Sequence, residues 1–140
     1  MKSSVPSLLC AGFLLAGLSL GGCGSSEYLI VGTPQAVGAD AVATAEEIEG
    51  GNLMITLEAR NLPPADRLSP GASKFVMWFV APKQQPQNMG KLEYDEDERE
   101  AQGVATTPKK QFEIRVTAES DANAVAPSAV VVFTKQIKED

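Results

Sequence analysis

The residues of this chain with the clearest capacity for chemistry are the carboxylates of an acidic run. Six of the eight residues at positions 93–100 are Asp or Glu. Hard cations such as Ca²⁺ bind clustered carboxylate oxygens, so Asp95, Asp97 and Glu98 are weak candidates for metal ligands. The run lacks the glycine that lets an EF-hand loop turn, and successive side chains on an extended turn point in different directions. We therefore expect a solvated hairpin tip, with a cation site as the alternative.

The composition offers little else for catalysis. None of the 140 residues is His, which excludes Ser-His and Cys-His dyads and imidazole metal ligands. Ser128 follows Pro127, but no spacing singles out a base to activate it. Paired carboxylates of a glycosidase need a cleft between them, roughly 5 to 10 Å wide, for which a small domain has little room. We expect a protein that is not an enzyme and uses no cofactor.

The charge balance argues against a nucleic-acid partner. The chain has 18 acidic and 12 basic residues, a formal net charge of -6 at pH 7. Phosphate binding needs a basic face, and no basic stretch supplies one.

The first twenty residues are typical of a secretory signal peptide. Lys2 gives a positive start, and the run from Val5 to Leu20 is uncharged and rich in Leu. This run is shorter than the roughly 20 residues that a membrane-spanning helix needs. It ends in the sequence Leu20-Gly21-Gly22-Cys23.

These four residues resemble the lipobox of bacterial lipoproteins, in which a branched apolar residue and two small residues precede a cysteine. The resemblance implies that the Cys23 thiol is acylated, that the chain is cut just before it, and that the new amino group is acylated too. Gly24 is not the Asp that commonly signals inner-membrane retention in such proteins, so the resemblance favours the outer membrane, facing the periplasm. The alternative is an ordinary secretory signal with an incidental cysteine.

Processing at Cys23 changes the working molecule. Removing residues 1–22 leaves 118 residues, and because Lys2 is lost the net charge becomes 11 minus 18, or -7. Cys10 leaves with the signal and Cys23 carries lipid, so we expect no disulfide. The domain then depends on its hydrophobic core, and the membrane is a partner through the lipid on Cys23.

Alternation of apolar and polar residues predicts strands through most of the mature chain. The pattern is clearest at 53–60 and 111–119, where one set of alternate residues is apolar. Gly50-Gly51 predicts a hairpin turn after a strand at 39–48, for which a short helix is the alternative. Further strands are expected at 74–82, 87–94, 101–107 and 129–137.

About seven strands, one long proline-containing crossover and no convincing helix predict an all-β fold. We expect an antiparallel Greek-key β-sandwich, immunoglobulin-like, with a small closed barrel as the alternative. The predicted organisation is a signal peptide at 1–22, a lipidated tether and extended arm at 23–38, and the β-sandwich at 39–138. The apolar run at 28–31 within the arm could also be an edge strand.

The segment 74–82 is unusual because both of its faces are apolar. Trp78 is expected to be buried, as in immunoglobulin domains, although it could stack on a ligand. If Trp78 points inward, then Phe75, Met77 and Phe79 lie on the outer face. These three residues form a possible partner surface, unless the arm at 28–31 or a loop covers them.

Several blocks of the chain resemble small uncharacterised bacterial lipoproteins and the extracytoplasmic domains of some anti-sigma factors. The resemblance lies in Phe75-Val76-Met77-Trp78, Asn88-Met89-Gly90-Lys91-Leu92, the segment 112–119 and Pro127-Ser128. It implies a β-sandwich and little about activity. The chain departs from anti-sigma factors because no spanning helix or cytoplasmic segment is evident.

These observations predict a lipid-anchored protein of the cell envelope. We expect a non-enzymatic interaction or assembly module with an envelope protein as partner. The alternative is a sensory periplasmic module, or one that binds a ligand or cation, related to anti-sigma sensor domains.

Overall fold

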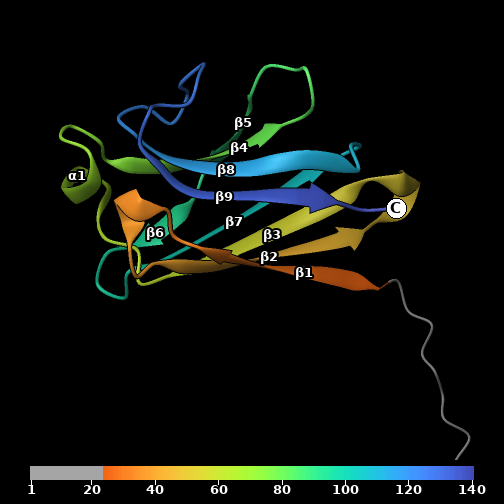
Figure 1. The fold of residues 1–140 in the computed structure, drawn as a ribbon, viewed down its shortest axis with the longest axis horizontal. Coiled ribbons are helices and arrows are strands. Elements are labelled where there is room, and N and C mark those ends of the chain that lie inside the picture. The colour runs from red at the N-terminus through yellow and green to blue at the C-terminus, as the bar shows by residue number, and fades with distance from the viewer. Residues whose placement is uncertain (1–23) are drawn as a thin grey trace, which may run out of the picture.

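The computed structural model describes residues 24–140, which form two stacked antiparallel sheets (Figure 1). The first sheet has the strand order β1-β2-β3-β7-β6 and the second the order β5-β4-β8-β9. The nine strands are β1 (Ser25–Val31), β2 (Asp40–Glu47), β3 (Leu53–Arg60), β4 (Lys74–Val80), β5 (Gln87–Lys91), β6 (Glu93–Asp95), β7 (Glu100–Thr107), β8 (Gln111–Glu119) and β9 (Val131–Lys138).

The strand order is that of an immunoglobulin-like Greek key. Strands β2, β3, β7 and β6 occupy the places of strands A, B, E and D, and β5, β4, β8 and β9 those of C′, C, F and G. The prediction of an antiparallel sandwich is therefore confirmed. The strands lie in two separate sheets and do not close into a barrel.

Two differences account for the nine strands in place of about seven. Strand β1 pairs with β2 over its whole length, from the Ser25–Glu46 pair to the Val31–Asp40 pair. The run at 28–31, predicted as an extended arm or an edge strand, is therefore part of the edge strand of the first sheet, which begins at Ser25.

The predicted strand at 87–94 divides between the two sheets. Its first part, β5, pairs with β4, and its last part, β6, pairs with β7. Gly90 has a φ of 107°, a backbone conformation that glycine adopts readily, and the Leu92 N–H donates to the Phe75 carbonyl as the chain crosses over.

Three short helices lie between the strands. The predicted Gly-Gly turn between β2 and β3 contains a 3-10 turn, η2 (Glu49–Gly51), and both glycines have positive φ. A second 3-10 turn, η1 (Pro34–Ala36), follows β1, and a one-turn helix, α1 (Ala65–Leu68), lies in the β3–β4 crossover. No helix within residues 24–140 is long and apolar enough to cross a membrane.

The core fills the space between the sheets. The inward side chains of β2 are alanines, whereas those of β4 and β8 include large rings. Phe79 and Phe112 stack with ring centroids 4.5 Å apart, and Phe75 meets Tyr94 edge-on at 5.2 Å. This burial of apolar area is the main source of stability in a fold of this size.

Candidate functional site

The prediction of a possible partner surface on β4 is wrong. Phe75, Met77 and Phe79 have 1%, 1% and 3% of their surface exposed and belong to the core between the sheets. Alternation along a strand sends every second side chain to the same face, and on β4 that set faces the first sheet. The set with Trp78 therefore lies on the outward face of the second sheet.

Trp78 is buried as expected, but not in the core between the sheets. Its side chain has no exposed surface, and the loop at 120–130 between β8 and β9 lies on this outward side of the second sheet (Figure 1). Asn88 fixes the loop by donating to the carbonyls of Ala122 and Ala124, at 2.9 and 3.0 Å. This loop explains why β4 is apolar on both faces.

A chain of buried hydrogen bonds lies under the same loop. The Trp78 Nε1–H donates to Thr117 Oγ1 at 2.8 Å, and the Thr117 hydroxyl donates to Glu119 Oε2 at 2.9 Å. The backbone N–H of Ser128 also donates to this oxygen at 2.9 Å. The Ser128 hydroxyl donates to the Ala118 carbonyl at 2.8 Å, which holds the end of the loop against β8. The arrangement fixes the loop to β8.

The acidic run forms the tip of the β6–β7 hairpin. Asp95 Oδ1 accepts the backbone N–H groups of Asp97 and Glu98, at 3.0 and 3.2 Å, in an Asx turn. All three side chains are exposed. Across residues 24–140, no group of three or more His, Cys, Asp or Glu side chains is placed to hold a metal ion. Asp95 therefore shapes the turn.

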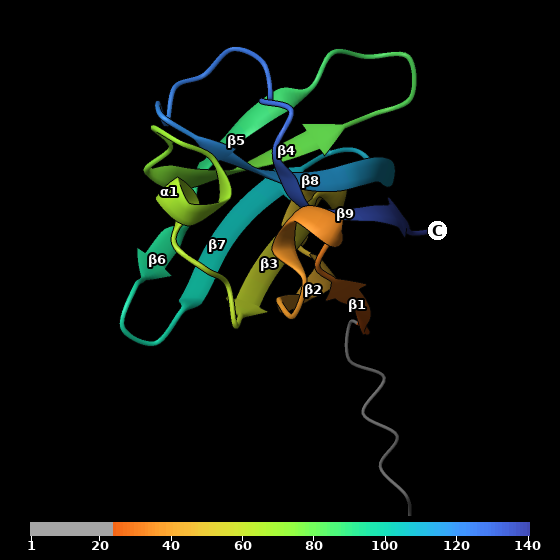
Figure 2. The same ribbon diagram turned by 60° about the vertical axis from the view of Figure 1, so that its left-hand side comes forward.

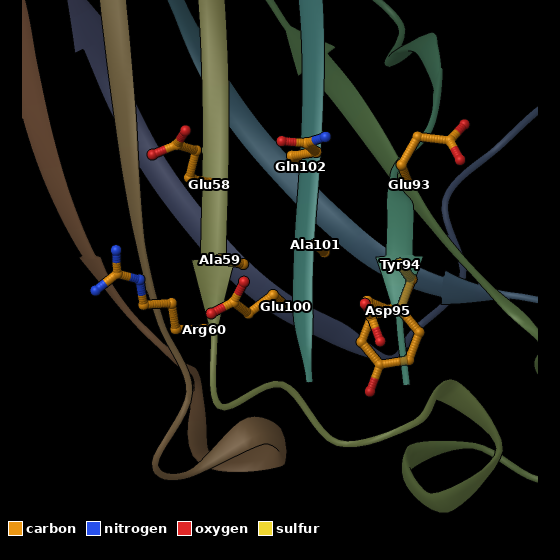
Figure 3. Close-up of a pocket in the computed structure, with 9 residues that line it drawn as sticks. All are labelled: Glu58, Ala59, Arg60, Glu93, Tyr94, Asp95, Glu100, Ala101 and Gln102. Carbon is orange, nitrogen blue, oxygen red and sulfur yellow. The ribbon is translucent and has the colours of Figure 1, made fainter. Parts of the chain in front are cut away.

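A shallow hollow of about 380 Å³ lies beside this hairpin, on the outward face of the first sheet (Figure 3). Glu58 on β3 and Glu93 on β6 each pair in register with Gln102 on β7. Figure 3 shows the two carboxylates directed away from each other on either side of Gln102. The hollow is a surface of separated carboxylates and does not gather them around one point.

Tyr94 lines the hollow, and its ring packs against Phe75 of the core. Its hydroxyl donates to the Leu62 carbonyl, and burial raises the pKa of Tyr94 above its ordinary value. The phenol thus fastens β6 to the β3–β4 crossover and is not presented to a ligand.

Two ion pairs are formed among residues 24–140, and both lie away from the acidic run. Lys110 pairs with Glu47 at 3.1 Å, and Arg115 with Glu113 at 2.9 Å. Burial acts to raise the pKa of Glu113, but hydrogen bonds from Arg115 and Thr134 outweigh it and hold that pKa below its ordinary value.

One surface was not anticipated from the sequence. Leu29 and Val31 project from the outward side of β1 with 72% and 80% of their surface exposed, and Val37, after η1, is 80% exposed. We call Leu29, Val31 and Val37 the β1 apolar patch. The continuous apolar run at 28–31 was a signal for it, because an edge strand with such a run must leave one set of side chains uncovered.

The predicted lipid attachment residue, Cys23, and the predicted signal peptide lie outside the described residues. Comparisons with protein-family models, with curated proteins and with solved structures gave no match.

Proposed function

We propose that this chain is an exported lipoprotein, anchored through Cys23 to the periplasmic face of the outer membrane. Its β-sandwich serves there as a non-enzymatic interaction or assembly module for another envelope component.

The observation that carries this proposal is the position at which the sandwich starts. Strand β1 begins at Ser25, two residues after the cysteine of the predicted lipobox. A folded domain that starts directly after the expected cleavage site is what a processed lipoprotein would contain.

An interaction role is supported by the outward face of the first sheet, which no other described element covers. Val104 on β7 is 60% exposed there and pairs in register with Thr56 of β3. A partner on this face is testable with a photo-crosslinking amino acid at Val104 in intact cells. A defined protein adduct is expected at Val104 and not at Val125, which is 95% exposed on the opposite side.

Lipid anchoring is tested by the C23S variant of the full chain. We expect the wild-type chain to incorporate an alkyne-labelled fatty acid, to lose residues 1–22 and to fractionate with the membrane. The variant should incorporate no label and appear in the soluble or unprocessed fraction. Label retained in C23S would contradict the proposal. The control is G24A, which should behave as wild type because a Cβ at Gly24 meets no atom within 4 Å.

A further inference from the structure

Exposed apolar side chains are concentrated at one edge of the sandwich. Five large hydrophobic residues within 24–140 are well exposed, and three of them form the β1 apolar patch. Leu29 lies in register with Val42 of β2, which is half-buried, so apolar surface continues onto the neighbouring strand. Monomeric proteins seldom leave such surface bare without a binding partner.

Two other edge strands, β6 and β5, carry features that discourage pairing with another chain. Strand β6 has three residues and exposes the carboxylates of Glu93 and Asp95. Strand β5 has an irregular register against β4 and a glycine with positive φ. Short, charged or irregular edges discourage pairing and association, whereas β1 has seven residues with one charge, Glu27.

The order of strands separates the β1 apolar patch from the acidic run. Strands β1 and β6 are the two edges of the first sheet, four strand spacings apart, or roughly 19 Å. Strand β9 lies close to β1, because the Tyr28 hydroxyl donates to the Lys138 carbonyl at 3.0 Å and the Thr33 N–H donates to the Val132 carbonyl at 3.0 Å. Strand β9, which contains Lys135 and Lys138, thus lies on the β1 side. The β6–β7 hairpin is remote from β1 (Figure 2).

We propose that the β1 side of the sandwich lies against the lipid headgroups of the membrane, with the β1 apolar patch inserted among them and the acidic β6–β7 edge facing away. This inference rests on the proposed lipidation of Cys23. Two Cα–Cα steps separate Cys23 from Ser25, a reach of about 7 Å, so the lipid holds the start of β1 at the membrane surface.

The remaining geometry fits a strand lying along the membrane. Val31 is six residues from Ser25, which in a strand is roughly 20 Å, and Val37 lies in the turn that follows β1. Contacts at both ends of β1 would then fix its direction. Lys135, half-buried on β9 at the β1 side of the sandwich, meets the headgroup phosphates.

The test places one spin label at a time on the lipidated full chain in vesicles of phosphatidylethanolamine and phosphatidylglycerol. V31C and V37C report on the β1 apolar patch, and V104C and V125C are matched controls, because all four replace exposed valines. Collision rates of the nitroxide with oxygen and with a water-soluble nickel chelate are then compared. We expect a several-fold higher oxygen-to-nickel ratio at 31 and 37 than at 104 and 125.

The outcomes separate this inference from the proposed function. If mass spectrometry finds no lipid on Cys23 and the chain does not float with vesicles, the proposed function is wrong and the inference falls with it. If the chain is lipidated and floats, but all four labels are equally accessible to nickel, the inference alone is wrong. Spin–spin broadening at 31 that disappears on dilution with unlabelled chain would show that β1 pairs with a second copy, which also overturns it.

Discussion

Buried polar side chains on the outward face of the second sheet show how much individual residues contribute to this domain. Trp78, Thr117 and Glu119 lie beneath a loop with almost no access to water, and each has a hydrogen-bond partner. Buried side-chain polar atoms without a partner do not occur among residues 24–140. Leaving one of these groups unpaired would cost free energy that the small core must offset.

Thr117 is the residue on which this hydrogen-bond chain depends. T117V keeps the shape but leaves the Trp78 Nε1–H and Glu119 Oε2 each short of a partner, so we expect the free energy of unfolding to fall by about 2–4 kcal/mol. Urea denaturation followed by the fluorescence of Trp78, the single tryptophan, measures this directly. T106V, on the exposed face of β7, should change stability by less than about 0.5 kcal/mol. Equal stabilities of the two variants would refute this account.

Glu113 makes the stability depend on pH. Its pKa is lowered in the folded chain, so its charged form contributes stability above the pKa of the unfolded chain, and this contribution is lost as pH falls through the folded pKa. We expect E113Q to lower the free energy of unfolding by about 1 kcal/mol at pH 7, because the neutral amide accepts weaker hydrogen bonds from Arg115 and Thr134. Between about pH 5 and pH 3 the difference from wild type should shrink. A difference that stays constant across that range, in denaturation series at several pH values, would contradict the assignment.

At the scale of elements, the strands with one apolar face were predictable from the sequence. The point at which the chain crosses from one sheet to the other was not. Strand β3 follows its period-two pattern residue for residue, and β8 follows it as far as Val116. Thr117 and Glu119 depart from the pattern because the loop at 120–130 covers them. The division of 87–94 into β5 and β6 leaves no mark in the pattern, because inward residues of both sheets are apolar. The inner face of β4 was assigned to the wrong side for a similar reason, since both of its faces are apolar and a loop distant in sequence covers one.

The turn that follows β1 leaves no room for a side chain at Gly32. A Cβ there would overlap the carbonyl oxygen of Ala36 and lie 2.9 Å from that of Ala39, both backbone atoms that cannot rotate away. We expect G32A to destabilise the domain by about 1–3 kcal/mol and to loosen β1 from β2. Thermal unfolding with hydrogen exchange on β1 measures both effects. G24A, where the Cβ meets no atom, should match wild type, and similar exchange in the two variants would refute the expectation.

At the scale of the whole molecule, charge is distributed unevenly. The carboxylates at 93–100 lie at the β6–β7 edge of the first sheet, whereas the opposite edge strand, β1, has a single charged residue, Glu27. Repulsion within the acidic edge weakens the folded state at low ionic strength and keeps that edge solvated. The same asymmetry favours the orientation proposed for the membrane-bound protein.

This repulsion is open to direct measurement. D97K reverses one exposed charge of the hairpin tip whose side chain forms no hydrogen bond in the turn, so we expect a gain of about 0.5 kcal/mol at low ionic strength. The gain should vanish near 1 M salt, where charges are screened within about 3 Å. E49K, in the turn between β2 and β3, is the control and should gain less. A gain at Asp97 that persists in high salt would point to a cause other than charge.

The sequence by itself determined the fold class, most strand positions and the lipobox pattern, because these depend on local periodicity and on residues adjacent in the chain. It also predicted an exposed acidic hairpin tip. Only the tertiary structure decided which face of β4 is internal, that 25–31 is a full strand of the sheet, and that Leu29 and Val31 lie uncovered at the edge opposite the acidic run. These properties depend on which distant segments lie side by side, and alternation along one strand carries no information about its neighbours.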